Sequence, residues 1–262
     1  MEITTDSLLL LALCFFVIAT LYSSVGFGGG SSYLAILTLF VGSFFVIRSL
    51  ALVCNLMVVS TSTYLYYKKG HFEIKKVLPF VGASIPLAFI GASFRLEEYI
   101  FFIILGIALM SSAILLLTQN IKKRKNNKEQ ETKIYPMWIT AALGAGIGFL
   151  SGLVGIGGGI FLAPILNHMR WDLSIKIAAL ASFFILVNSI SGIAGLVINE
   201  MFVFPWKLGL ILLGAVLLGG QLGIRISLHK LSGAGIKILT AILVFIVGLR
   251  VLLNNGLGLI NF

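Results

Sequence analysis

The sequence predicts an all-α, polytopic membrane protein with two inverted repeats, each made of a glycine-broken helical hairpin and three transmembrane helices. Three observations lead to this prediction. Of the 262 residues, 59% are hydrophobic and only 11% are charged, whereas soluble domains carry about a quarter charged residues. Uncharged runs of bilayer length alternate with short charged segments. A GxGGG motif occurs once in each half, at 26–30 and 155–159.

The first repeat, expected at 1–119, begins with a stretch that is too long for one helix. The 41 residues between Asp6 and Arg48 are uncharged, and about 20 residues suffice to cross a bilayer. The glycine motif lies near the middle of this stretch, so we expect a hairpin at 7–42 in which a helix breaks and a shorter helix returns. Shorter uncharged runs, bounded by charged residues, predict spans at 47–67, 77–94 and 99–118.

The second repeat, expected at 136–262, shows the same order after a charged linker at 120–135. The 36 residues between Lys133 and Arg170 are uncharged and contain the second glycine motif, which predicts a hairpin at 136–168. The runs that follow predict spans at 175–199, 207–225 and 233–253. Such a repeat within one chain indicates duplicated structural units.

The placement of Lys and Arg favours an inverted relation between the repeats. If each hairpin returns to the side from which it starts, fifteen of the 19 Lys and Arg residues lie on the side of the linker and four on the other. If each hairpin crosses the membrane, the repeats are parallel and the division is 12 to 7. Cytoplasmic loops are rich in Lys and Arg. We therefore expect a cytoplasmic linker, both termini outside, and a multi-pass protein of the cell (plasma or inner) membrane.

Several classes of function are not expected. The net charge of +10 reports on loop placement in a membrane protein, so nucleic acid is not an expected partner. Cys14 and Cys54 lie in apolar runs and indicate neither a disulfide nor a metal site. No nucleotide-binding loop or nucleophile–base pair is visible, so we expect no enzyme activity and no cofactor. The expected partners are the lipid bilayer and a small anion, and the glycine-rich spans would suit a homodimer.

The two interrupted helices indicate transport of an anion. A helix that begins inside the membrane offers free N–H groups and the positive end of its dipole, and glycine lets a ligand approach the backbone. Inverted repeats with broken helices are a transporter plan. The alternative is that the glycines only allow close helix packing. The candidate binding residues at the breaks are Gly28, Gly29, Gly30, Gly157, Gly158 and Gly159.

Polar residues within the spans extend this candidate site. Asn55 and Asn188 fall at matching places in the two halves, and the alternative role for each is an interhelical clamp. Arg48 and Lys176 open the spans that follow the hairpins and are candidates for steering an anion, or else ordinary interface anchors. The remaining candidates, which alternatively cap helices or clamp them together, are Ser24, Ser31, Ser151 and Gln221.

The motifs "VGFGGG" (25–30) and "GLVGIGGGIFLAPIL" (152–166), with the two four-part halves and the charged linker, resemble the sulfite exporter TauE/SafE family of membrane permeases. The first motif departs from the second, since it is followed by serines and no proline. The resemblance implies export of sulfite, sulfonates such as sulfoacetate, and related anions. An anion channel, a transporter of another small organic anion and a membrane scaffold are the alternatives.

Overall fold

The computed structural model describes residues 5–24, 26–125, 132–228 and 233–258, and within these ranges the chain is helical and has no strands. The long helices are α1 (Thr5–Ser23), α3 (Phe44–Lys68), α4 (Ile74–Ser93), α5 (Glu98–Lys125), α6 (Met137–Val154), α8 (Ser174–Ile198), α9 (Trp206–Leu228) and α10 (Gly233–Arg250). Two short helices are α2 (Gly30–Leu37) and α7 (Gly159–Met169), and a π-helical turn (Val251–Gly256) follows α10.

The helices have the length and composition of membrane spans. Seven helices of the described part, namely α1, α3, α4, α5, α6, α8 and α9, are long and apolar enough to cross a bilayer. Their outward faces are apolar too, for example at Leu13, Leu78 and Leu218, each of which is more than half exposed. Exposed apolar surface on this scale is stable in lipid and not in water. The predicted all-α, polytopic fold is therefore confirmed.

Both hairpins break at their glycine motifs. Gly26 and Gly29 have φ angles of 85° and 89°, and Gly155 and Gly158 have φ angles of 82° and 81°. These are left-handed conformations that only glycine adopts without strain. In each motif the second of these residues directly precedes the short helix. The first and fourth positions of the two motifs therefore share one conformation, whereas at the third position Gly157 is left-handed and Gly28 is not.

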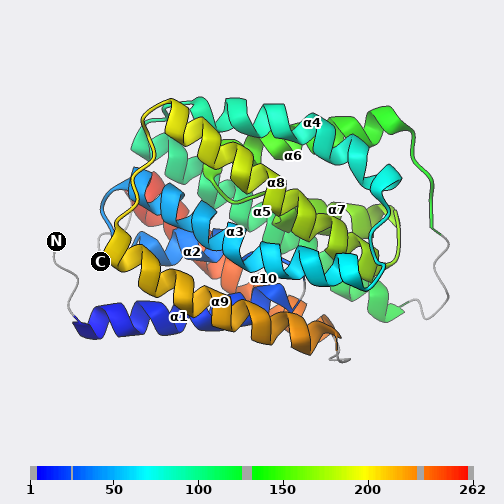
Figure 1. Cartoon of the computed structure of the whole chain (residues 1–262), viewed down its shortest axis with the longest axis horizontal. Coiled ribbons are helices and arrows are strands. Elements are labelled where there is room, and N and C mark those ends of the chain that lie inside the picture. Colours follow the sequence, from blue (N-terminus) through cyan, green and yellow to red (C-terminus); the bar gives the residue numbers. More distant parts are fainter. Residues whose placement is uncertain (1–4, 25, 126–131, 229–232, 259–262) are drawn as a thin grey trace.

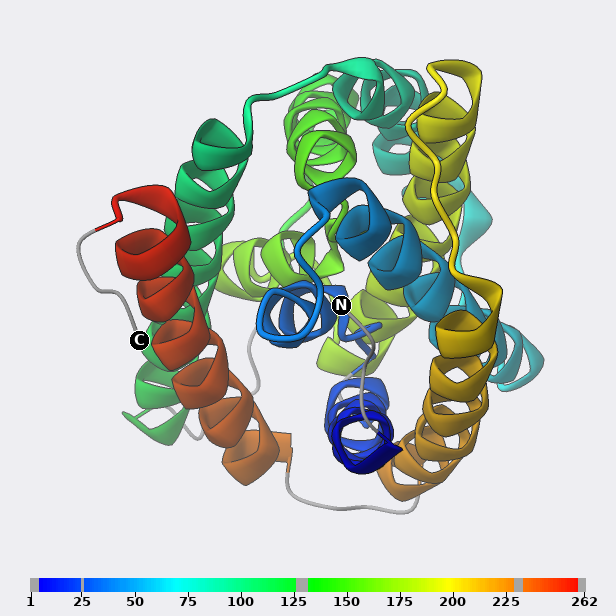
Figure 2. The same cartoon turned by 90° about the vertical axis from the view of Figure 1, so that its left-hand side faces the viewer.

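The two short helices lie inside the molecule. Seven of the eight residues of α2 are buried, as are the first six residues of α7. Figure 2, which looks along the long axis, shows α2 and α7 surrounded by the longer helices. In Figure 1, α1 begins and α2 ends at the left-hand end of the molecule, whereas α6 begins and α7 ends at the right-hand end. The starts of both short helices are thus held in the protein interior.

Glycine faces bring the first helix of each hairpin against a helix of the other half. Gly144, Gly148 and Gly152 of α6 are so close to α4 that a Cβ atom there would collide with its backbone. Gly219 and Gly223 of α9 meet α1 in the same way. Small residues commonly permit such approach between membrane helices. Because these glycines pack within the chain, they lend no support to the expected homodimer.

Two sequence expectations about helix ends differ from the structure. α5 continues to Lys125, so the expected linker (120–135) begins as helix, since nothing in 120–125 breaks the backbone pattern. Residues 126–131 of that linker lie outside the described residues. The last span was expected at 233–253, and its α-helix ends at Arg250, where a π-helical turn takes over.

Ion pairs join the two halves at the end of the molecule that carries the linker. Lys76 lies 2.8 Å from Asp172, and Lys176 pairs with Glu73. Nearby, the backbone N–H of Lys133 donates to the carbonyl of Arg170 at 2.9 Å. At the opposite end, Nη2 of Arg95 donates to the carbonyl of Asn199 at 3.0 Å. Contacts between the halves therefore close both ends of this conformation.

The Glu73 carboxyl predicts a modest dependence of stability on pH. Hydrogen bonds from Lys176 and then Lys76 hold the pKa of Glu73 below its ordinary value. A carboxyl with a depressed folded-state pKa stabilises the protein above its ordinary pKa, and this contribution is lost as the pH falls through the lower folded-state value. We expect Glu73→Gln to lower the melting temperature slightly at neutral pH and not in acid, with a small effect because the group is exposed. Thermal unfolding at both pH values measures this, with Glu97→Gln as the control, and equal shifts at both pH values would contradict it.

Candidate functional site

The two breaks meet at one buried side chain, Asn55 of α3. Its Oδ1 atom accepts a hydrogen bond of 2.8 Å from the backbone N–H of Gly30, the first residue of α2. Its Nδ2 atom donates a hydrogen bond of 2.8 Å to the carbonyl of Ile156, inside the second motif. An asparagine amide presents both an acceptor and donors. Asn55 therefore ties the two glycine motifs together, as the clamp interpretation of this residue requires.

Part of the glycine pattern follows from this contact. A Cβ atom at Gly28 or Gly30 would collide with the Asn55 amide, and one at Gly157 would lie 3.1 Å from Nδ2 of Asn55. Close packing thus accounts for these three glycines. Close packing does not account for which backbone N–H groups are hydrogen-bonded at the starts of the two short helices, and this differs between the two breaks.

The start of α7 keeps one donor, the N–H of its first residue, whose counterpart at the start of α2 is already bonded. The N–H of Gly30 is occupied by Asn55. At the second break, Phe161 and Leu162 donate to the carbonyl of Gly158, whereas the described hydrogen bonds give the N–H groups of Gly159 and Ile160 no acceptor. Free first-turn N–H groups and the helix dipole make such a start attractive to an anion.

Buried polar atoms without a partner surround this helix start. Oγ of Ser151, Oδ1 of Asn188 and Oγ of Ser189 have no hydrogen-bond partner among the described residues, and each side chain is at most 1% exposed. Ser189 Oγ lies 3.2 Å from the position of a Cβ atom at Gly157, and Ser151 Cβ lies 3.1 Å from that at Gly158. Leaving such a group unsatisfied costs about 1–3 kcal/mol. Two of them, on Ser151 and Ser189, lie beside the second motif and indicate a site for a polar ligand, and the third, on Asn188, lies one residue before Ser189 on α8.

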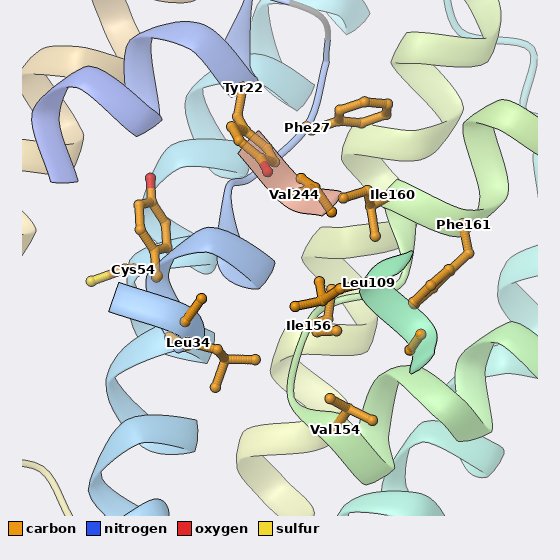
Figure 3. Packing of buried hydrophobic residues seen from close by; sticks show 14 of the residues in the cluster. Tyr22, Phe27, Leu34, Cys54, Leu109, Val154, Ile156, Ile160, Phe161 and Val244 are labelled. Atoms are coloured by element: carbon orange, nitrogen blue, oxygen red, sulfur yellow. The ribbon is translucent and has the colours of Figure 1, made fainter. Parts of the chain in front are cut away.

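Apolar side chains close the site in this conformation. Ile185 of α8 packs against Gly157 and Gly159, with its Cγ2 atom 2.6 Å from the position of a Cβ atom at Gly157. Phe27 and Ile156, the residues inside the two GxGGG motifs, are 3% exposed and belong to the main apolar core. Figure 3 shows both of them with Ile160 in that core. Because water is excluded here, the helix dipole and the hydroxyl groups act with little screening.

Arg48 lies inside the protein and not at an exposed mouth. Its side chain is fully buried, and its Nη2 atom donates to the carbonyls of Gly152 at 3.1 Å and Ala92 at 3.4 Å. The guanidinium carbon lies 5.8 Å from the centre of the Phe101 ring, within the range of cation–π attraction. Interface anchoring does not describe this position, because an anchor keeps its charged group in the aqueous headgroup region.

The other residues expected at the site lie away from the second break. Ser24 donates to the carbonyl of Leu21 in its own turn at 2.6 Å. Ser31 lies 3.4 Å from the hydroxyl of Tyr22, beside the first break. Gln221 is exposed on α9, since its side chain points away from the glycines that pack on α1. Lys176 belongs to the ion pairs at the start of α8.

The sequence reading missed Ser182 and Ser189. Ser182 donates to the carbonyl of Gly26 at 2.9 Å, in the first break, while Ser189 lies beside Gly157 in the second. Seven residues separate them, which is close to two helical turns and places both on one face of α8. Their seven-residue spacing was the available signal in the sequence. In the structure, each of the two serines contacts a different glycine motif.

The open grooves of the described surface lie elsewhere. One, of about 600 Å³, runs between α4 and α8 and is lined by apolar side chains such as Ile85, Phe89 and Ile190. Its serine, Ser191, already donates to the carbonyl of Ile85 at 2.6 Å. Such a groove suits lipid chains and offers no free donor to an anion.

Membrane helices that are interrupted inside the protein, with a buried polar site at the interruption, define a polytopic membrane transporter. More specifically, the chain belongs to the sulfite exporter TauE/SafE family, which it matches over residues 11–251.

Two curated relatives carry names of the same class. The probable membrane transporter protein y4hK of Sinorhizobium fredii is 34% identical over 245 residues, which cover 92% of this chain and 97% of the relative. The probable membrane transporter protein MJ0441 of Methanocaldococcus jannaschii is 27% identical over 264 residues, which cover 93% of this chain and 95% of the relative. No solved structure matches the chain.

Proposed function

We propose that this protein exports small sulfur-containing oxyanions, such as sulfite or sulfoacetate-like sulfonates, by alternating access around a site at the start of α7. The observation that carries the proposal is the pair of unpaired buried hydroxyls beside that helix start, on Ser151 and Ser189, with the unpaired amide oxygen of Asn188 one residue before Ser189 on α8. The family name supplies the sulfur chemistry. The chain is not expected to catalyse a reaction.

The donors at the second break suit an oxyanion. Free N–H groups at the start of α7 and the hydroxyls of Ser151 and Ser189 donate to the oxygens of a sulfite or sulfonate. Asn188 currently donates from Nδ2 to the carbonyl of Phe184 and leaves Oδ1 free. We expect this amide to turn over when the anion binds, so that Nδ2 faces the ligand. Ile185 must then move aside, because it covers the glycines.

The opposite directions of the two hairpins support alternating access. The hairpins start from opposite ends of the molecule (Figure 1), and the first helix of each hairpin packs on the other half. With the Lys-rich and Arg-rich end in the cytoplasm, the linker faces the cytoplasm and the start of α1 faces outside, in the cell membrane. Rocking of one half against the other then breaks the contacts at one end while those at the other end remain.

The membrane potential is a sufficient driving force for export. A monoanion that leaves a negative cytoplasm gains about 2.3 kcal/mol per 100 mV. The described carboxylates lie near helix ends or in loops, for example Glu73, Glu98 and Glu200. No carboxylate of the described part is therefore placed at the break to carry a proton with the anion.

Ligand-dependent stability of the purified protein tests the proposed substrate class. We expect sulfite and sulfoacetate to raise the melting temperature, because a ligand at 100 times its Kd stabilises the native state by about 2.7 kcal/mol. Dimethyl sulfone, which keeps the sulfur–oxygen bonds but lacks charge, is the control and should have no effect. Stabilisation by carboxylates alone would refute the sulfur assignment.

Transport in liposomes tests the mechanism. We expect saturable movement of sulfite that follows an imposed potential. Movement that ignores the potential and follows a pH gradient would refute potential-driven export. Single-channel currents would assign the protein to anion channels instead.

A further inference from the structure

Arg48 carries a buried charge that the protein itself does not neutralise. Its side chain is the largest of the fully buried ones in the described part of the chain. No described carboxylate lies within 4 Å of it, and neither Nε nor Nη1 has a hydrogen-bond partner among the described residues. A charge taken out of water and left without a counter-charge is strongly destabilising. Such an arrangement persists where a ligand supplies the missing charge.

The contacts of Arg48 compensate only part of this cost. Its Nη2 atom donates to the carbonyls of Ala92 and Gly152, which lie within the last turns of α4 and α6. The C-terminal ends of helices carry partial negative charge. Phe101 adds the weak attraction of a ring face at 5.8 Å. These groups hold the guanidinium in place while three of its N–H bonds, one on Nε and two on Nη1, remain available.

Arg48 and Asn55 lie on the same face of α3 and flank the second break. They are seven residues apart, which corresponds to two turns and about 10.5 Å along the helix. Asn55 contacts Ile156, while the aliphatic part of Arg48 lies 3.5 Å from the position of a Cβ atom at Gly155. The second glycine motif therefore runs between a neutral clamp and an unmatched positive charge.

We propose that Arg48 binds the transported oxyanion directly, as the charged half of the site whose neutral half is the start of α7. This inference rests on the proposed function and adds to it a specific requirement for charge. The ligand class is a small anion with several oxygen atoms on one centre, such as sulfite or a sulfonate head group. Such a ligand accepts hydrogen bonds from Nε and Nη1 and supplies the counter-charge.

Affinity measurements on Arg48 variants test the inference. We expect Arg48→Gln to weaken sulfite binding by about 10- to 100-fold, the loss of a charged hydrogen bond, and Arg48→Lys to weaken it less because the charge is kept. Arg250→Gln is the matched control, since it removes the same charge from an exposed position at the end of α10. It should bind sulfite as the wild type does. Sulfite-dependent melting shifts and sulfite efflux from liposomes provide the two readouts.

The outcomes separate this inference from the proposed function. If the wild type binds sulfite and both Arg48 variants bind it equally well while melting lower, Arg48 only caps α4 and α6, and the inference is wrong while the proposed function stands. If Arg48→Gln does not fold, Arg48→Lys alone decides. Unchanged sulfite affinity in Arg48→Lys would show that Nε and Nη1 of Arg48 do not bind the anion. If no oxyanion stabilises the wild type, the proposed function fails and this inference fails with it.

Discussion

Replacing Gly158 with valine is expected to abolish transport without preventing membrane insertion. Gly158 has a φ angle of 81°, a conformation that costs an L-residue about 1–2 kcal/mol and is least tolerated by a β-branched one. A Cβ atom there would also lie 2.8 Å from the ring of Phe184 and 3.1 Å from Cβ of Ser151. The substitution therefore displaces the start of α7 and its polar neighbours. Each 1.4 kcal/mol lost from the transporting state lowers a rate about tenfold. We therefore expect sulfite efflux to fall at least tenfold.

Gly146→Val provides the matched control. Gly146 lies in α6, the helix that precedes the second break, and it is exposed on the helix surface, where its Cβ position meets nothing within 4 Å. This variant should insert and transport like the wild type. Gly29→Val, at the corresponding place of the first break with a φ angle of 89°, should resemble Gly158→Val in stability. Normal efflux by Gly158→Val would show that the glycines serve packing alone.

The helices and their breaks were predictable because each leaves a local mark in the sequence. A run of uncharged residues has to be helical to satisfy its backbone in lipid, and its length gives the span. Glycines at the centre of a run that is twice too long mark the place where the helix stops. The breaks at 26–30 and 155–159 follow from this reasoning. The end of α5 could not be predicted in this way, because residues 120–125 are polar yet continue the helix.

The site was less predictable because its partners are distant in the sequence. Arg48 at the head of a span resembles an interface residue, and only the carbonyls of Ala92 and Gly152, 44 and 104 residues away, show that it is buried. Likewise, Asn55 and Asn188 occupy matching positions, but one is bonded to both breaks and the other keeps a free oxygen. No local pattern distinguishes them, since the difference lies in tertiary contacts.

The contrast between the two asparagines yields the second large expected effect. Asn55→Leu keeps the branched shape of the side chain but leaves the N–H of Gly30 and the carbonyl of Ile156 without partners. Each unpaired buried group costs about 1–3 kcal/mol. We therefore expect a large fall in melting temperature and, because the two breaks are no longer joined, loss of sulfite efflux.

Asn188→Leu should not lower the melting temperature as Asn55→Leu does, but it too should reduce sulfite efflux. It removes an acceptor that is already unpaired and a donor to the carbonyl of Phe184, which the backbone N–H four residues on still satisfies within α8, so the melting temperature without ligand should hold or rise. The stabilisation by sulfite should fall, because the amide expected to face the anion is gone and a hydrogen bond to a charged group is worth about 1.5–3 kcal/mol. Melting curves of both variants, with and without sulfite, measure the two effects separately. Equal loss of stability in both would mean that Asn188 is a clamp like Asn55, and the binding site would then have to lie outside the start of α7.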